Sequence, residues 1–149
     1  YVDNILARDD VLLIDKVLAY NTLMVALVAQ ERAPESIDLG LGLLELLGVH
    51  FPQNKVLMGF STISGLMKCK RVTRRLSKEK FANLPLILDP KEVSIHKTLD
   101  LLSVSAYSCR PELVPLVLIK MVQRTLRIGV TKHSCVALAM LGILMAGVL

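Results

Sequence analysis

The sequence predicts an all-α fold, built as a stack of antiparallel helix pairs. Leu dominates the apolar residues, whereas there are only three Tyr, three Phe and no Trp, a balance that favours helices over strands. Apolar residues recur at steps of three and four along most of the chain, which is the period of an α-helix. No segment alternates apolar and polar residues in the way a half-buried strand does.

The first predicted helix spans residues 10–30. Its inward face is expected to carry Leu13, Val17, Tyr20, Met24 and Leu27. Either Asp9 or Asp10 is placed to cap its start, because a carboxylate there can accept from free backbone N–H groups.

A second helix is expected to follow a short turn at residues 31–33. Pro34 fits its first turn, where the missing N–H costs nothing, and Gly48 is placed to end it in a left-handed conformation. Its inward residues are expected to be Ile37, Leu41 and Leu44. A connection this short makes the two helices antiparallel neighbours.

The third helix is expected over residues 54–72. We expect it to point Leu57, Phe60, Ile63, Leu66 and Met67 inward. Gly59 and Gly65 either weaken this helix or let a neighbour approach closely. Ser77 is placed to cap a short helix through Phe81, and a loop follows at 83–90.

Three more helices complete the prediction. One runs from Pro90 to about Ser108, one opens at Pro111 and ends at Gly129, and the last begins at Thr131. The expected inward face of the first comprises Ile95, Leu99, Leu102 and Ala106. The second has a single polar stripe of Lys120, Gln123, Arg124 and Arg127, so the rest of it can be buried. Residues 1–149 are interpreted as a single helical-repeat region, with a weak internal division at loop 83–90.

Residues 35–46, Glu-Ser-Ile-Asp-Leu-Gly-Leu-Gly-Leu-Leu-Glu-Leu, resemble the second helix of a tetratricopeptide unit. Over residues 11–149 the chain also resembles the helical region that follows the ATPase module in large predicted-ATPase signalling proteins. The matching stretches are Leu44–Val49 with Pro52, the basic run before Asn83-Leu84-Pro85, Asp89-Pro90, Ala106-Tyr107, and Leu118–Val122. The resemblance implies a tetratricopeptide-like solenoid between an ATPase switch and an output kinase or cyclase.

The function that follows is a non-catalytic segment for protein–protein interaction and signal relay. The sequence contains no G-x-x-x-x-G-K-[ST] loop and no kinase catalytic loop, so we expect no enzyme activity and no cofactor. Because the chain starts without Met and stops inside an apolar run, we expect a fragment of a longer cytoplasmic protein, poorly soluble in isolation. Its partners would then be other domains of the same polypeptide, rather than nucleic acid or a membrane.

A second function class comes from the charge distribution. Residues 68–80 hold seven Lys and Arg against a single Glu79, a local charge of +6 in a chain whose net charge is +5. The alternative is therefore a basic-patch module that binds nucleic acid or anionic lipid. The candidate anion- or partner-binding residues are Lys70, Arg71, Arg74 and Arg75. No aromatic residues alternate with these cations, as they do in single-strand binders, so a solvated helix end is the simpler interpretation.

The remaining reactive side chains are expected to be structural. His50, His96 and His133 are far apart in sequence, with Asp100 one turn after His96, and we interpret them as surface or capping residues, with no metal site. Cys69 lies between Lys68 and Lys70, a setting that can activate a thiol, but a structural role is preferred. The uncharged run 133–149 is shorter than a membrane span needs, and we expect a buried solenoid helix.

Overall fold

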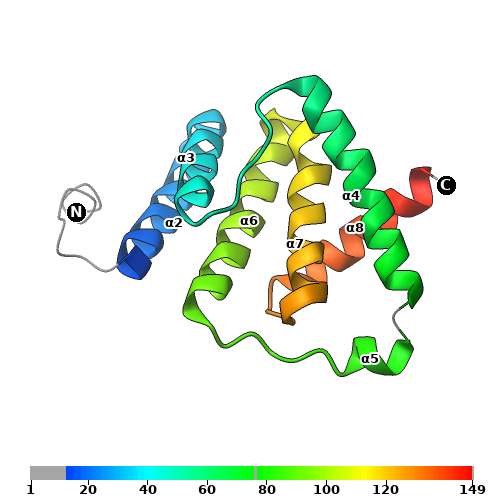
Figure 1. The fold of residues 1–149 in the computed structure, drawn as a ribbon. Coiled ribbons are helices and arrows are strands. Elements are labelled where there is room, and N and C mark those ends of the chain that lie inside the picture. The colour runs from blue at the N-terminus through cyan, green and yellow to red at the C-terminus, as the bar shows by residue number, and fades with distance from the viewer. Residues whose placement is uncertain (1–12, 76, 149) are drawn as a thin grey trace.

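The computed structural model describes residues 13–75 and 77–148, and the all-α class is confirmed over them (Figure 1). The expected capping residues Asp9 and Asp10 lie outside the described residues. The helices are α2 (Leu13–Ala29), α3 (Ala33–Leu46), α4 (Lys55–Arg75), α5 (Lys78–Ala82), α6 (Pro90–Cys109), a 3₁₀ turn (Pro111–Leu113), α7 (Val114–Ile128) and α8 (Ser134–Val148). The bounds therefore agree closely with those predicted for most helices.

Two antiparallel pairs, α2–α3 and α6–α7, form the body of the fold (Figure 1). Helix α3 packs against α6, which makes the two pairs contiguous, and α7 in turn packs against α4 and α8. In a solenoid that stacks its helices in chain order, α4 would lie beside α3. Here the segment after α3 crosses the molecule and places α4 on the far side of α7 (Figure 1).

The ends of α2 and α3 have the same hydrogen-bond pattern. At α3, Val49 N–H donates to Leu44 O and Gly48 N–H to Glu45 O, with Gly48 at φ +83°. This is a Schellman motif, so the expected cap at Gly48 is confirmed. At α2 the corresponding left-handed residue is Glu31, at φ +61°, a position that the sequence did not reveal.

The core is formed by the inward faces of α2, α3, α6 and α7. The face expected for α6, Ile95, Leu99, Leu102 and Ala106, is completely buried. On α7 the polar stripe stays near the surface while Leu116, Val117, Ile119, Met121 and Val122 are buried. Both predictions are confirmed.

The inward face expected for α4 was wrong at four of its five residues, and only Leu66 packs against the core as predicted. Leu57, Phe60, Ile63 and Met67 are 58%, 73%, 62% and 68% exposed. A second stripe at helical spacing faces the body instead: Met58, Gly65, Leu66 and Cys69. A Cβ on Gly65 would lie 2.6 Å from Ile119 Cγ2, so α7 packs closely against this narrow face. The sequence of α4 contains two apolar stripes, and only the shape of the neighbouring helix α7 determines which of them is packed inward.

Helix α8 begins three residues later than expected. Thr131 belongs to its capping turn, in which the Thr131 backbone N–H donates to Ser134 Oγ at 3.0 Å. Ala137 and Leu141 pack into the core while Val136 and Ile143 are exposed, so α8 is half-buried, not fully buried. Among the described residues, no helix combines the length and the apolarity needed to cross a bilayer.

The loop after α5 is held by two backbone hydrogen bonds to the segment after α7. Ile87 N–H donates to Val130 O at 2.9 Å, and Val130 N–H donates to Pro85 O at 2.8 Å. Gly129, at φ +141°, leaves no room for a side chain, because a Cβ would lie 2.2 Å from Pro85 O. Ser77 caps α5 as expected, accepting from Lys80 N–H.

Candidate basic interface

The four basic residues singled out from the sequence all lie on the last turns of α4. Lys70, Arg71, Arg74 and Arg75 share one stripe of the helix, and with Met67 they line a shallow surface hollow. Arg74 and Arg75 occupy the final turn, where the helix dipole favours positive charge. Helix stability alone therefore accounts for part of this cluster.

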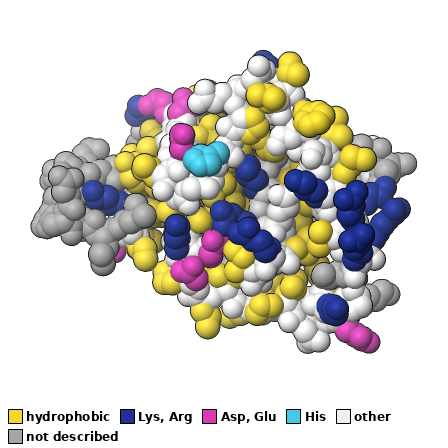
Figure 2. Space-filling view, in the orientation of Figure 1, with side chains coloured by type: hydrophobic (Ala, Val, Ile, Leu, Met, Phe, Trp, Pro, Cys, Tyr) yellow, Lys and Arg dark blue, Asp and Glu magenta, His cyan; other side chains and the backbone are white. Residues whose placement is uncertain are grey.

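Basic residues of α7 extend the cluster across the molecule (Figure 2). Between α4 and α7 lies a second hollow, lined by Lys68, Cys69, Arg71, Val72, Gln123, Leu126 and Arg127. It shares Arg71 with the hollow on α4, so basic residues of the two helices border adjoining hollows. The sequence showed these as two separate segments, a basic run and a polar stripe.

A third hollow lies between the end of α3 and α7. It is lined by Gly48, Val49, His50, Lys120, Gln123, Arg124 and Arg127, and its volume is about 410 Å³. Gln123 and Arg127 also line the second hollow, so the three depressions form one basic band. No Asp or Glu lines these three hollows among the described residues.

The cations of the third hollow differ in their partners. Arg124 forms an ion pair with Glu92 of α6, whereas Lys120 Nζ lies 5.0 Å from the centroid of the Phe51 ring. Burial, together with repulsion from Arg124, lowers the pKa of Lys120. Lys120 is thus a partly buried cation whose neighbours are an aromatic ring and further cations.

The outer face of α4 adds an apolar surface to this band. Val56, Leu57, Phe60, Ile63 and Met67 are all exposed, and Met67 borders the basic stripe. A contiguous apolar stripe on an already packed helix is typical of a surface that contacts another molecule.

The three histidines have different environments. His50 is exposed, but His96 is completely buried, so the expectation of a surface or capping histidine at 96 was wrong. Its Nδ1 donates to Glu92 O at 2.9 Å, and Nε2 lies 3.4 Å from Thr125 Oγ1. Burial lowers the pKa of His96, because desolvation disfavours the imidazolium.

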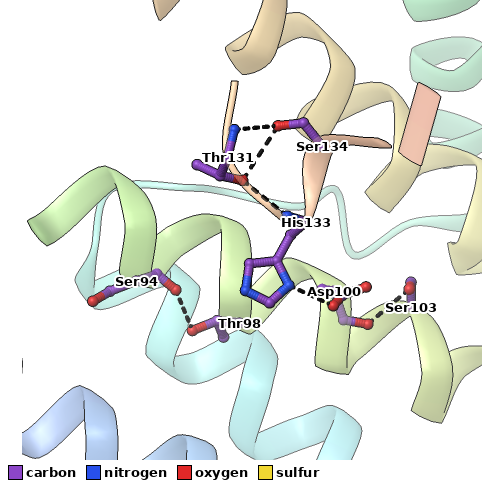
Figure 3. A network of polar contacts seen from close by, with 7 residues as sticks. All are labelled: Ser94, Thr98, Asp100, Ser103, Thr131, His133 and Ser134. Carbon is purple, nitrogen blue, oxygen red and sulfur yellow. Dashed lines mark hydrogen bonds and ion pairs between the residues drawn. The ribbon is translucent and has the colours of Figure 1, made fainter. Parts of the chain in front are cut away.

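Asp100 interacts with His133, although the sequence places it one turn after His96. His133 Nδ1 lies 2.7 Å from Asp100 Oδ2, which ties the start of α8 to α6 (Figure 3). Beside it, Ser134 Oγ accepts from the Thr131 backbone N–H in the turn before α8, so this polar cluster holds the start of α8 against α6. Within residues 13–75 and 77–148, His, Cys, Asp and Glu side chains form no group of three that could hold a metal ion.

Cys69 is buried in the contact between α4 and α7. Desolvation raises the pKa of its thiol, although a hydrogen bond with Gln123 acts in the opposite direction. The flanking Lys68 is exposed and Lys70 is half-buried, whereas the burial of Cys69 favours the neutral thiol. This agrees with the structural role preferred from the sequence.

Comparison with models of known protein families, with curated protein sequences and with solved structures gave no match.

Proposed function

We propose that this chain is a non-catalytic docking segment, which binds another protein through the outer face of α4. The observation that carries this proposal is the exposure of Leu57, Phe60, Ile63 and Met67 on a helix whose opposite face is packed against α7. Large exposed apolar side chains at helical spacing are what a partner helix uses as anchors.

The charge beside this stripe indicates what kind of partner fits. The apolar residues lead directly into Lys70, Arg71, Arg74 and Arg75 at the end of α4. A complementary partner is an amphipathic helix whose apolar anchors are followed by Asp or Glu. Apolar contacts would supply most of the affinity, and the charges would set orientation and speed association.

The resemblance to predicted-ATPase signalling proteins supports a wider proposal. In this proposal the chain is a tetratricopeptide-like, cytoplasmic segment of such a multidomain protein, and its partner is another domain of the same polypeptide. A displacement of α4 would reach α6 through α7, since these helices are packed in series. The segment would relay the motion of an ATPase switch to an output domain without chemistry of its own.

A designed peptide tests the docking face. The probe is an amphipathic helical peptide with Leu anchors and a Glu-rich end, and its binding is followed by fluorescence anisotropy. We expect saturable binding that is weakened at least tenfold by Phe60→Ser with Ile63→Ser. The matched control replaces Val136 and Ile143 on the exposed face of α8 and should leave the affinity unchanged. Absence of binding, or equal loss in the control, contradicts the proposal.

The second candidate function is binding of nucleic acid or anionic lipid through residues 68–80. The basic residues that border adjoining hollows on α4 and α7 favour it. The apolar stripe and the basic end on one helix favour it too, because this combination is typical of helices that lie in a membrane interface. Sedimentation with anionic vesicles and gel shifts with DNA or RNA test it. Binding that falls steeply with salt would favour this function over protein docking. So would binding that is abolished by Lys70→Glu, Arg71→Glu, Arg74→Glu and Arg75→Glu together.

A further inference from the structure

The hollow between the end of α3 and α7 has the composition of an anion site that is separate from the α4 face. Three of its seven lining residues, Lys120, Arg124 and Arg127, are cationic, and Gln123 adds an amide. All four come from successive turns of α7, so one rigid helix positions them. The opposite wall is the Schellman turn at Gly48 and Val49, held by its hydrogen bonds to α3.

The charges in this hollow are not balanced within the described structure. Glu92 is the one carboxylate in an ion pair with them, and it contacts Arg124 from the α6 side. Lys120 rests on Phe51, and no described carboxylate lies within ion-pair distance of Lys120 or Arg127. Burial and the charge of Arg124 lower the pKa of Lys120, because both disfavour the charged ammonium. A negative charge in the hollow would offset these two effects.

The size and donor set of the hollow indicate a small ligand with a phosphate group. A volume of about 410 Å³ falls within the range of small-molecule sites, about 300–1,000 Å³, and is bounded on one side by the turn. A guanidinium offers a planar fork of donors and an ammonium a compact charge, and together they suit the several oxygens of a phosphate better than a single carboxylate. The N–H groups of Gly48 and Val49 already donate to α3 carbonyls, so side chains must supply the donors.

We propose that this hollow binds a small phosphorylated molecule, whose phosphate is held by Lys120, Arg127 and the amide of Gln123. Arg124 contributes its charge while its Nη1 stays bonded to Glu92. Arg127 also lines the hollow between α4 and α7, so the bound anion lies within the basic band and next to that hollow. The site is independent of the proposed docking face, since none of its residues belongs to the exposed apolar stripe.

Titration with inorganic pyrophosphate at low salt tests the site, using calorimetry on the full chain. We expect saturable binding with one site per chain, weakened at least tenfold by Lys120→Met with Arg127→Met. The charge-matched control is Lys91→Met with Lys132→Met, two exposed lysines that line none of the three hollows described above, which should change the affinity less than twofold. Equal weakening in both variants would mean that the affinity depends only on the net charge of the chain, and this would overturn the proposal.

Two further measurements locate the ligand and define its chemistry. Amide chemical shifts should move at Gly48 and Gln123 on adding pyrophosphate, and not at Arg74 and Arg75. Shifts centred on Arg74 and Arg75 would overturn the location. Citrate should bind at least tenfold more weakly than pyrophosphate, and equal binding would overturn the assignment to phosphate. The proposal would also be overturned if the chain bound anionic vesicles through Lys120 and Arg127 but did not bind free pyrophosphate.

Discussion

Arg124 of α7 donates from Nη1 to both carboxylate oxygens of Glu92 on α6, at 2.9 and 2.6 Å. Both side chains are less than one-fifth exposed, and the Glu92 carbonyl oxygen also accepts from the buried His96. Glu92 thus links the largely buried ion pair with Arg124 to the buried imidazole of His96.

Glu92→Gln should destabilise the fold by about 2 kcal/mol, because it leaves a largely desolvated guanidinium without its counter-charge. Urea unfolding followed by circular dichroism measures this free energy. Glu35→Gln provides the comparison, since the Arg32–Glu35 pair is about half exposed and contributes little in water. Equal effects of the two substitutions would mean that the Arg124–Glu92 pair is as well solvated as a surface pair.

The stability should depend on pH through His96. Its pKa is lowered by burial, so the unfolded chain takes up a proton at about pH 6.5 while the folded chain stays neutral at this residue. With respect to His96, the free energy of unfolding is therefore constant and highest above that pH, and it decreases as the pH drops below it. The groups that act on this ring are Glu92, Arg124 and His133.

His96→Gln should flatten this slope between pH 7 and pH 5, whereas His50→Gln, at an exposed position, should leave it unchanged. Thermal melts at a series of pH values provide the measurement. A slope that survives His96→Gln would assign the pH dependence to another group.

Gly65 and Gly59 should respond in opposite directions to substitution by Ala. At Gly65 a Cβ would lie 2.6 Å from Ile119 Cγ2, whereas at Gly59 nothing lies within 4 Å. Gly59→Ala should stabilise by about 0.5–1 kcal/mol through helix propensity. Gly65→Ala should destabilise by about 1 kcal/mol, because overpacking outweighs the same gain. Chemical denaturation of the two variants decides the sign, and stabilisation by both would contradict the close α4–α7 contact.

Glu31 and Gly48 occupy equivalent left-handed positions after α2 and α3. Glu31→Gly should raise the melting temperature, with a gain of about 0.5–1 kcal/mol, because glycine adopts positive φ without steric cost. Gly48→Ala should lower it by a similar amount, although nothing crowds that position. A loss of stability in Glu31→Gly would show that the carboxylate, not the backbone conformation, matters there.

Cys69 should resist thiol reagents that modify Cys109 and Cys135. The first is buried with a raised pKa, whereas the other two are exposed, and only the thiolate reacts readily. Mass spectrometry after brief exposure to iodoacetamide should show two labels on the folded chain and three in denaturant. Rapid labelling of Cys69 would indicate that α4 detaches from α7, or that the flanking lysines do activate it.

The sequence alone determined the local elements of this protein. Apolar spacing, Pro34, Pro90, Gly48 and Gly129 predicted where the helices begin and end, since those signals act within a turn or two of the chain. The buried face of α6 was also predictable, because Ile95, Leu99, Leu102 and Ala106 recur at steps of three and four and are all buried.

Tertiary structure decided the rest. Helix α4 carries two apolar stripes at the same period, and the close contact of Gly65 with Ile119 selects the one that faces α7. The joining of residues 68–75 to the polar stripe of α7 into one basic band, and the partners of His96 and Asp100, depend on which helices pack together. Apolar periodicity describes one helix at a time, whereas these surfaces and ion pairs are each formed by two helices. They therefore depend on how the helices pack, which the sequence pattern does not show.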